Sequence, residues 1–200
     1  MSAALLWPLQ AGTEALPRKR FTREEFDRLI ESGFFEGQRY ELIDGDLIDK
    51  MGQNPPNAVA IQLALVWLGT VFNLKLIRVQ LSIEVSTADR LGSVPEPDLA
   101  VLAEWKSEYA KRHPRGDELL LAIEVSDTSA AFDLSRKALL YAAAGVPEYW
   151  VLGLRHRLLV LHREPSDTGY RSTRLFAEHE TVTLESRSEA VRVGDLLPTE

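Results

Sequence analysis

Three carboxylates occur within or beside apolar segments of the sequence, where a charged side chain is costly. Glu41 follows an aromatic residue and precedes two aliphatic ones. Asp98 opens the apolar segment 99–102, and Glu124 ends a run of five apolar residues. A buried carboxylate usually has a cation or a hydrogen-bond donor as its partner. Hard carboxylate oxygens suit Mg²⁺ or Mn²⁺ better than zinc, so we expect these three acids to form a divalent-metal site.

Each of these acids also has a simpler structural interpretation. Glu41 could lie on the exposed face of a hairpin. Asp98 follows Pro97 and could be an ordinary loop residue. Glu124 could lie at the exposed end of a buried strand, since strand ends commonly carry acids in solvent. The three acids are far apart in the sequence, so only the fold can decide whether they meet.

Lys137 is the fourth candidate residue. It lies in a segment with helical periodicity, where residues 133, 137 and 141 fall on one stripe by the i, i+4 rule. The functional interpretation directs the Lys137 ammonium at the carboxylates. The simpler interpretation is a surface ion pair with Asp133, which would contribute only about 0.3–0.5 kcal/mol.

The elements that must position these residues follow from hydrophobic periodicity and turn signals. A capping box at Thr22 and Glu25 marks a helix start, and Asp44-Gly45 suits the tight turn of a hairpin. The order of elements predicts a mixed sheet with a few helices rather than a regular βαβ alternation. The expected elements are helices at 23–32, 58–72 and 133–144, a hairpin at 40–48, strands at 76–85, 98–102, 118–125, 149–152 and 158–161, and short strands to about 193.

The middle helix is expected to start after a loop at Asn54-Pro55-Pro56. Its apolar residues recur at helical spacing, which is typical of a helix packed into a core. The residues expected to make that contact are Val59, Leu63, Val66, Trp67 and Phe72.

Composition limits the classes of function. The chain has 200 residues, no cysteine and a net charge of −7. The lack of cysteine excludes thiolate nucleophiles and cysteine-ligated zinc and is compatible with a cytoplasmic location, which we expect. The acidic balance counts against a nonspecific nucleic-acid binder. We expect a flexible tail at 1–19, a single domain at 20–200, and no membrane span because no apolar run is long enough.

The segments around the three acids and Lys137, taken together, resemble those of a known family. The sequence is similar to the "putative restriction endonuclease" family of the PD-(D/E)XK nuclease superfamily, which is also catalogued as a domain of unknown function. The resemblance covers about residues 20–195, and its most specific part is the last of the matching stretches. The matching stretches are Tyr40 to Ile48, Pro97 to Val101, Ala122 to Ser126, Asp133 with Lys137, and Tyr141 to Trp150.

The resemblance implies a restriction-endonuclease-like α/β (α+β) fold, with extra antiparallel strands at the C-terminal end, and a role for each candidate residue. Asp98 and Glu124 would be direct metal ligands, and Glu41 an additional acid acting directly or through water. Lys137 would position the attacking water or offset charge on the phosphate. Gln80 matches a position that the family often fills with glutamine, without an assigned role.

Two features of this sequence depart from the pattern of the superfamily and of the family that it resembles. The superfamily commonly has a lysine two residues after the second acid, where this chain has Ser126. Many relatives carry a histidine near the start of the helix that follows the hairpin, where this chain has Asn57. The four histidines of the chain share no metal-binding spacing.

We therefore expect a metal-dependent endonuclease that uses Mg²⁺ or Mn²⁺ to hydrolyse phosphodiester bonds of nucleic acid, with DNA as the expected substrate. One alternative is an inactive nucleic-acid-binding or protein-interaction module on the same fold. Another is a metal-dependent hydrolase that acts on a nucleotide in a closed pocket. The apolar strands at 149–152 and 158–161 could offer a sheet edge for a homodimer.

Overall fold

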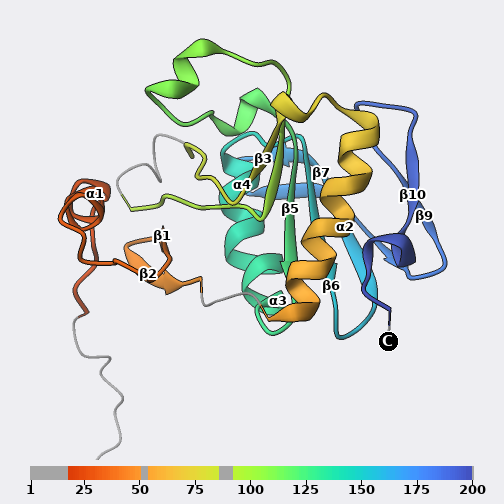
Figure 1. Ribbon diagram of the computed structural model, residues 1–200, viewed down its shortest axis with the longest axis horizontal. Helices are drawn as coiled ribbons and strands as arrows, with labels where there is room; N and C mark the ends of the chain where they lie inside the picture. The colour runs from red at the N-terminus through yellow and green to blue at the C-terminus, as the bar shows by residue number, and fades with distance from the viewer. Residues whose placement is uncertain (1–17, 51–53, 86–91, 200) are drawn as a thin grey trace, which may run out of the picture.

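The computed structural model describes residues 18–50, 54–85 and 92–199, and its centre is a six-stranded sheet (Figure 1). The β5–β6 pair is parallel and the other neighbouring pairs are antiparallel. The expected mixed sheet of an α+β fold is confirmed, whereas most of the tail expected at 1–19 lies outside the described residues. In spatial order the strands are β3 (Ile77–Val79), β4 (Leu99–Leu102), β5 (Leu119–Ser126), β6 (Glu148–Gly153), β7 (Leu158–Ser166) and β8 (Gly169–Ala177).

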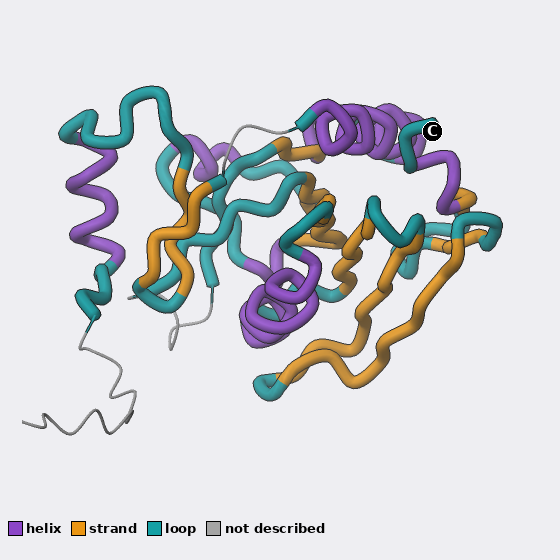
Figure 2. The backbone as a smooth tube through the Cα atoms, turned by 90° about the horizontal axis from the view of Figure 1, so that it is seen from below, coloured by secondary structure: helices purple, strands orange, loops and turns teal. Residues whose placement is uncertain are grey.

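Helices cover both faces of this sheet (Figure 2). The helix α2 (Pro55–Val71) packs on one face. The other face is covered by a continuous helical segment made of α3 (Ala130–Phe132), η4 (Asp133–Lys137) and α4 (Ala138–Ala143). The middle part, η4, is a π-helical turn rather than the regular α-helix that the periodicity predicts.

The strand β5 lies between the two layers because its side chains are apolar on both faces. Leu121 and Ile123 belong to the core cluster under α2. Ala122 belongs to the cluster on the other face, under α4. Residues two apart in a strand share a face, so Glu124 points to the same side as Ala122, toward the helical segment that carries Lys137.

The face of α2 that enters the core agrees only in part with the one expected: Phe72 and Trp67 contact the core, but other expected residues do not. The buried residues of this helix are Ala60, Ile61, Ala64 and Leu68, whereas Val66 is 63% exposed and Val59 is 41% exposed. The helix has no charged residue and is apolar on most sides, so periodicity alone could not select a face. The helix also begins earlier than expected, because proline is tolerated in the first helical turn.

A two-stranded hairpin, β1 (Tyr40–Ile43) and β2 (Asp46–Asp49), lies beside the main sheet. Asp44 and Gly45 both have positive φ angles, 49° and 81°, as the expected type I′ turn requires. The helix α1 (Arg23–Glu31) packs on the hairpin, and its predicted capping box is present. The hairpin therefore forms where the sequence predicts it.

The C-terminal part adds antiparallel strands. The β7–β8 hairpin is longer than expected, at nine residues in each strand. A small second sheet pairs β9 (Thr181–Thr183) with β10 (Ala190–Arg192), and the 3₁₀ turn η5 (Val193–Leu196) follows. This arrangement changes the expected dimer edge: the strands at 149–152 and 158–161 are interior, because β8 pairs on the outside of β7.

The remaining elements are short 3₁₀ turns. They are η1 (Leu74–Leu76), η2 (Ser107–Ala110) and η3 (Gly116–Glu118). The last two lie in the segment between β4 and β5. Among the helices of the described residues, none has the length and apolar character needed to cross a membrane.

Candidate active site

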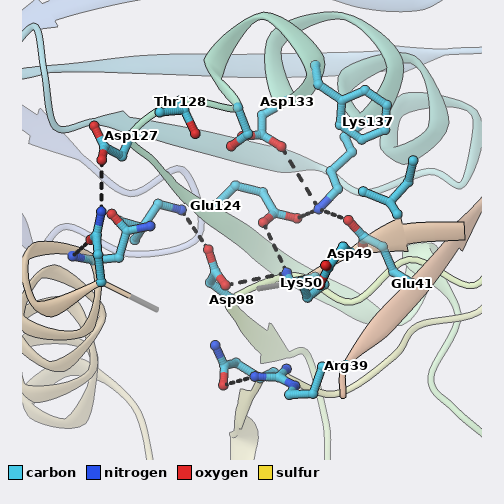
Figure 3. Close-up of a pocket in the computed structure, with 17 residues that line it drawn as sticks. Arg39, Glu41, Asp49, Lys50, Asp98, Glu124, Asp127, Thr128, Asp133 and Lys137 are labelled. Atoms are coloured by element: carbon cyan, nitrogen blue, oxygen red, sulfur yellow. Dashed lines mark hydrogen bonds and ion pairs between the residues drawn. The ribbon is translucent and has the colours of Figure 1, made fainter. Parts of the chain in front are cut away.

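The fold brings the four predicted site residues into one cluster (Figure 3). Glu41 comes from β1, Asp98 from the residue before β4, Glu124 from β5 and Lys137 from the end of η4. Their exposed fractions are 2%, 6%, 3% and 2%. None of the three acids is a solvent-exposed loop or strand-end residue, so the simpler interpretations of these residues are wrong.

The Lys137 ammonium links two of the acids. Its Nζ atom lies 2.8 Å from Oε1 of Glu41 and 2.8 Å from Oε1 of Glu124. Asp133 is farther away, at 3.9 Å, so the expected surface pair is not the main contact of this lysine. Burial by itself lowers the pKa of Lys137, but the surrounding carboxylates outweigh it and raise this pKa well above its ordinary value. Lys137 therefore stays charged at neutral pH.

Glu124 is fixed by two donors at one oxygen. Its Oε1 accepts hydrogen bonds from Nζ of Lys137 and from the hydroxyl of Tyr141, each at 2.8 Å. Burial raises the pKa of Glu124, but Lys137 and then Lys50 outweigh it, and the net pKa is lowered. Glu124 is therefore held as an ionised carboxylate although it is only 3% exposed.

Asp98 faces Glu124 because of the register between β4 and β5. The strands are antiparallel and Leu99 pairs with Ile123. Asp98, which precedes Leu99, therefore lies beside Glu124, which follows Ile123. Oδ2 of Asp98 accepts a hydrogen bond from the backbone N–H of Val125 at 2.9 Å. Burial and the nearby charge of Glu124 raise the pKa of Asp98 to about 6.

Both carboxylate oxygens of Glu41 have partners of their own. Its Oε1 contacts Lys137, and its Oε2 accepts a hydrogen bond from the backbone N–H of Glu96 at 3.1 Å. Within the described ranges, no three acidic or histidine side chains are grouped so that they could share one metal ion. The structure thus does not place Glu41 as a third direct ligand beside Asp98 and Glu124.

The π-helical turn sets the position of Lys137. The backbone N–H of Ala138 bonds to the carbonyl of Asp133, five residues earlier, where an α-helix would use four. Asp133 and Lys137, at the two ends of this turn, are both buried. Burial, followed by the charge of Glu124, raises the pKa of Asp133 to about 6. Asp133 is thus a fourth acid of the cluster, to which the sequence assigned only a surface role.

Lys50 is a site residue that the sequence analysis missed. It follows β2, and its ammonium lies 3.5 Å from Oδ1 of Asp98 and 3.8 Å from Oε2 of Glu124. The same Nζ donates a hydrogen bond to the backbone carbonyl of Glu96 at 2.7 Å. A lysine at the end of a polar hairpin strand is normally exposed, so the sequence offered little signal for it.

These groups line a cavity of about 350 Å³. Gln80, whose role the sequence left open, lines it and accepts a hydrogen bond from Arg39 at 2.7 Å. Asn57 lines it as well, and its Oδ1 is buried without a hydrogen-bond partner among the described residues. The cavity therefore combines the acid pair with basic and amide groups around it.

Comparison with known proteins places this chain in a family. The family model Uma2, described as "Putative restriction endonuclease", matches residues 23–193. The chain belongs to this family. None of the curated proteins compared matches the chain.

A solved structure has the same fold as this Uma2 chain. It is a protein from Anabaena variabilis ATCC 29413, described as a putative nuclease belonging to DUF820. The TM-score is 0.69 at 15% identity, and the match covers 88% of this chain and 97% of the other. At this identity the similarity supports the restriction-endonuclease-like fold alone.

The donor set of the Uma2 site fits a magnesium or manganese ion with few protein ligands. Asp98 Oδ1 and Glu124 Oε2 both face the Lys50 ammonium, so a positive charge is already stabilised between them. Mg²⁺ is commonly held by one or two carboxylates, with water and substrate phosphate completing its coordination. Asp98 and Glu124 are therefore the residues that would hold such an ion.

Replacing Tyr141 by Phe is expected to destabilise the protein by about 1.5–3 kcal/mol, because a buried carboxylate loses one of its two donors at Oε1. Urea unfolding of the variant measures this change. Tyr149→Phe is the matched control, since the Tyr149 hydroxyl donates to the backbone carbonyl of Asp133 rather than to a carboxylate. An equal or larger effect in the control would contradict the assigned role of Tyr141.

The raised pKa of Asp98 predicts a pH-dependent difference in stability between the metal-free protein and its Asp98→Asn variant. The pKa rises from 3.8 to about 6 on folding, so the native state binds the proton more tightly. Protonation of Asp98 therefore adds to the free energy of unfolding. This stabilisation is fully present below about pH 4 and is lost as the pH rises through about 6. In EDTA, the free energy of unfolding of the wild type should fall by on the order of 2 kcal/mol relative to that of the variant between pH 4.5 and 7.5. Parallel pH profiles of urea unfolding would contradict the prediction.

Proposed function

We propose that this chain is a divalent-metal-dependent nuclease that hydrolyses phosphodiester bonds of nucleic acid, with DNA as its substrate. The observation that carries the proposal is the convergence of Asp98, Glu124 and Lys137, from separate elements, at one cavity. Membership of the Uma2 family supports the same reaction class. A purely structural ion pair would not need a second acid at Asp98, whose burial is unfavourable enough to raise its pKa.

A bound Mg²⁺ or Mn²⁺ would lower the pKa of water and polarise a phosphoryl oxygen. Asp98 and Glu124 would hold it, because their facing oxygens point into the cavity. Lys137 keeps Glu124 ionised and fixes its orientation through the 2.8 Å contact. Since Lys137 is only 2% exposed, the geometry supports a positioning role for it rather than direct contact with substrate.

The basic groups on the cavity wall would receive the phosphate. Lys50 lines the cavity at its acidic centre, and Arg39 lines it with 44% of its side chain exposed. Positive groups around a carboxylate pair attract a phosphate that the acids alone would repel. This local arrangement offsets the net charge of −7, which would otherwise oppose binding to nucleic acid.

An inactive binding module on the same fold is the second candidate. The position of Lys50 favours it, because an ammonium already stabilises the Asp98–Glu124 pair without a metal ion. The net charge of −7 also favours a partner other than nucleic acid. A homodimer through the outer strand β8 remains a further proposal, since β8 forms one edge of the main sheet.

A cleavage assay on several nucleic acids tests the proposal. The purified protein is incubated with supercoiled plasmid, linear duplex DNA, single-stranded DNA and RNA, each with Mg²⁺, Mn²⁺ or EDTA. We expect cleavage of at least one DNA form with either metal and none with EDTA. Absence of cleavage on all four substrates with both metals would refute the nuclease assignment and leave the binding module.

A further inference from the structure

Lys50 reaches the acidic centre from the hairpin rather than from the main sheet. Its backbone N–H bonds to the carbonyl of Arg39 at 2.8 Å, which fixes the residue at the base of the hairpin. Its side chain is only 13% exposed and points into the cavity beside Asp98 (Figure 3). Lys50 is thus positioned by the hairpin, independently of the helix that carries Lys137.

The two lysines serve different oxygens of the cluster. Lys137 contacts Oε1 of Glu124 and Oε1 of Glu41. Lys50 faces the other Glu124 oxygen, Oε2, together with Oδ1 of Asp98. These last two oxygens are the pair that would hold a metal ion. Lys50 is therefore the counter-charge of the two metal-binding oxygens, whereas Lys137 stabilises the Glu124 oxygen that does not face Asp98.

The Lys50 contacts are looser than those of Lys137. Charge-assisted hydrogen bonds between ammonium and carboxylate are usually about 2.7–2.9 Å long. Lys137 meets this range at both of its main contacts, whereas Lys50 lies at 3.5 and 3.8 Å from the two oxygens. The tightest contact of Lys50 is with a neutral backbone carbonyl, that of Glu96. Such an ammonium can leave the acid pair without breaking a short ion pair.

We propose that Lys50 is an exchangeable counter-ion that competes with a divalent cation for the Asp98–Glu124 pair. In the metal-free protein it offsets the repulsion between the two carboxylates. An ammonium and a divalent cation repel each other, so both cannot stabilise the same two oxygens at full strength. The affinity for metal is therefore set partly by the lysine that the metal must displace. This inference rests on the proposed function only in taking these two acids as the metal ligands.

Calorimetric titration with Mn²⁺ tests the competition. The wild type, Lys50→Met and Arg39→Met are each titrated in metal-free buffer at neutral pH. We expect Lys50→Met to bind Mn²⁺ roughly 10-fold more tightly or better, because the competitor is gone. Arg39→Met is the matched control, since Arg39 lines the same cavity but bonds to Gln80 and Glu96. Equal or weaker Mn²⁺ binding by Lys50→Met would overturn the proposal.

Thermal unfolding provides a readout that needs no metal. In EDTA at neutral pH, Lys50→Met should melt ~5 °C below the wild type, because the acid pair loses its counter-charge. Saturating Mn²⁺ should remove or reverse that difference. An unchanged melting temperature in EDTA would also overturn the proposal. Lys50→Gln, which keeps a donor for the Glu96 carbonyl, replaces the methionine variant if that one does not fold.

The outcomes separate this inference from the proposed function. Tighter Mn²⁺ binding by Lys50→Met without any cleavage by the wild type would support the counter-ion and refute the nuclease. Cleavage by the wild type with unchanged Mn²⁺ affinity in Lys50→Met would refute the counter-ion and support the nuclease. Absence of Mn²⁺ binding in both proteins would refute both.

Discussion

Replacing Asp98 by Asn is expected to reduce metal-dependent DNA cleavage by at least about 10³-fold, equivalent to about 4 kcal/mol of transition-state stabilisation. Asp98 is one of the two carboxylates whose oxygens face each other across the acidic centre. The amide has nearly the same shape but carries no negative charge, so it would hold a divalent cation poorly. Single-turnover cleavage with Mg²⁺ measures the loss.

The fold of the Asp98→Asn variant should remain intact, which makes the loss of activity interpretable. Burial, and after it the neighbouring charge of Glu124, disfavours the ionised form of Asp98 and raises its pKa. A neutral side chain removes that repulsion and leaves an acceptor for the N–H of Val125. We therefore expect equal or higher thermal stability at pH 7.5, in contrast to an inactivation caused by unfolding.

Asp127→Asn is the matched control for this prediction. Asp127 lines the same cavity, but its oxygens bond to Asn54 and Arg155, each at 2.8 Å, rather than to the acid pair. We expect its cleavage rate to stay within about 10-fold of the wild type, as befits a group that acts only indirectly on the centre. Full activity in Asp98→Asn, or equal losses in both variants, would contradict the assignment of Asp98 as a metal ligand.

Replacing Lys137 by Met is expected to destabilise the protein by about 3–5 kcal/mol. The ammonium is the shared partner of Glu41 and Glu124, which are almost fully buried and would be left without their counter-charge. Native proteins of this kind are stable by about 5–15 kcal/mol in total, so the variant should be close to unfolding at 37 °C. Urea unfolding at neutral pH measures the change.

A second substitution tests whether charge is the cause. Adding Glu124→Gln to Lys137→Met removes one of the two buried carboxylates left without a counter-charge. The double variant should therefore regain part of the lost stability. Lys19→Met serves as the surface control, because Lys19 pairs with Glu25 in solvent and its loss should change stability far less. A Lys137→Met variant as stable as the Lys19→Met control would show that the buried contacts contribute little.

The local elements of the fold could be read from the sequence wherever one segment carried its own signal. The hairpin turn requires positive φ at Asp44 and Gly45, and those residue types tolerate it, so its place was predictable. The uninterrupted apolar run before Glu124 indicated the central strand, because a strand covered on both faces is apolar throughout. The outer position of β8 could not be read, because strand order depends on contacts between distant segments.

The site could be predicted only in part. Carboxylates in apolar surroundings pointed to Glu41, Asp98 and Glu124 because burial without a partner is costly. Lys137 was found through the family resemblance, since the residue on its own is as consistent with a surface pair. Lys50 could not be found, because its burial comes from the packing of the hairpin against the sheet, which leaves no periodic trace around residue 50.

The π-helical turn at residues 133–137 determines how the site would respond to a change in chain length, because it holds one residue more than an α-helical turn. Removing one residue from 134–136 would leave an ordinary helical turn, so the helix that follows would keep its orientation. Removing one residue from the regular helix at 138–140 would instead rotate Tyr141 by about 100°, away from Glu124. We therefore expect a deletion at 134–136 to be tolerated better than one at 138–140.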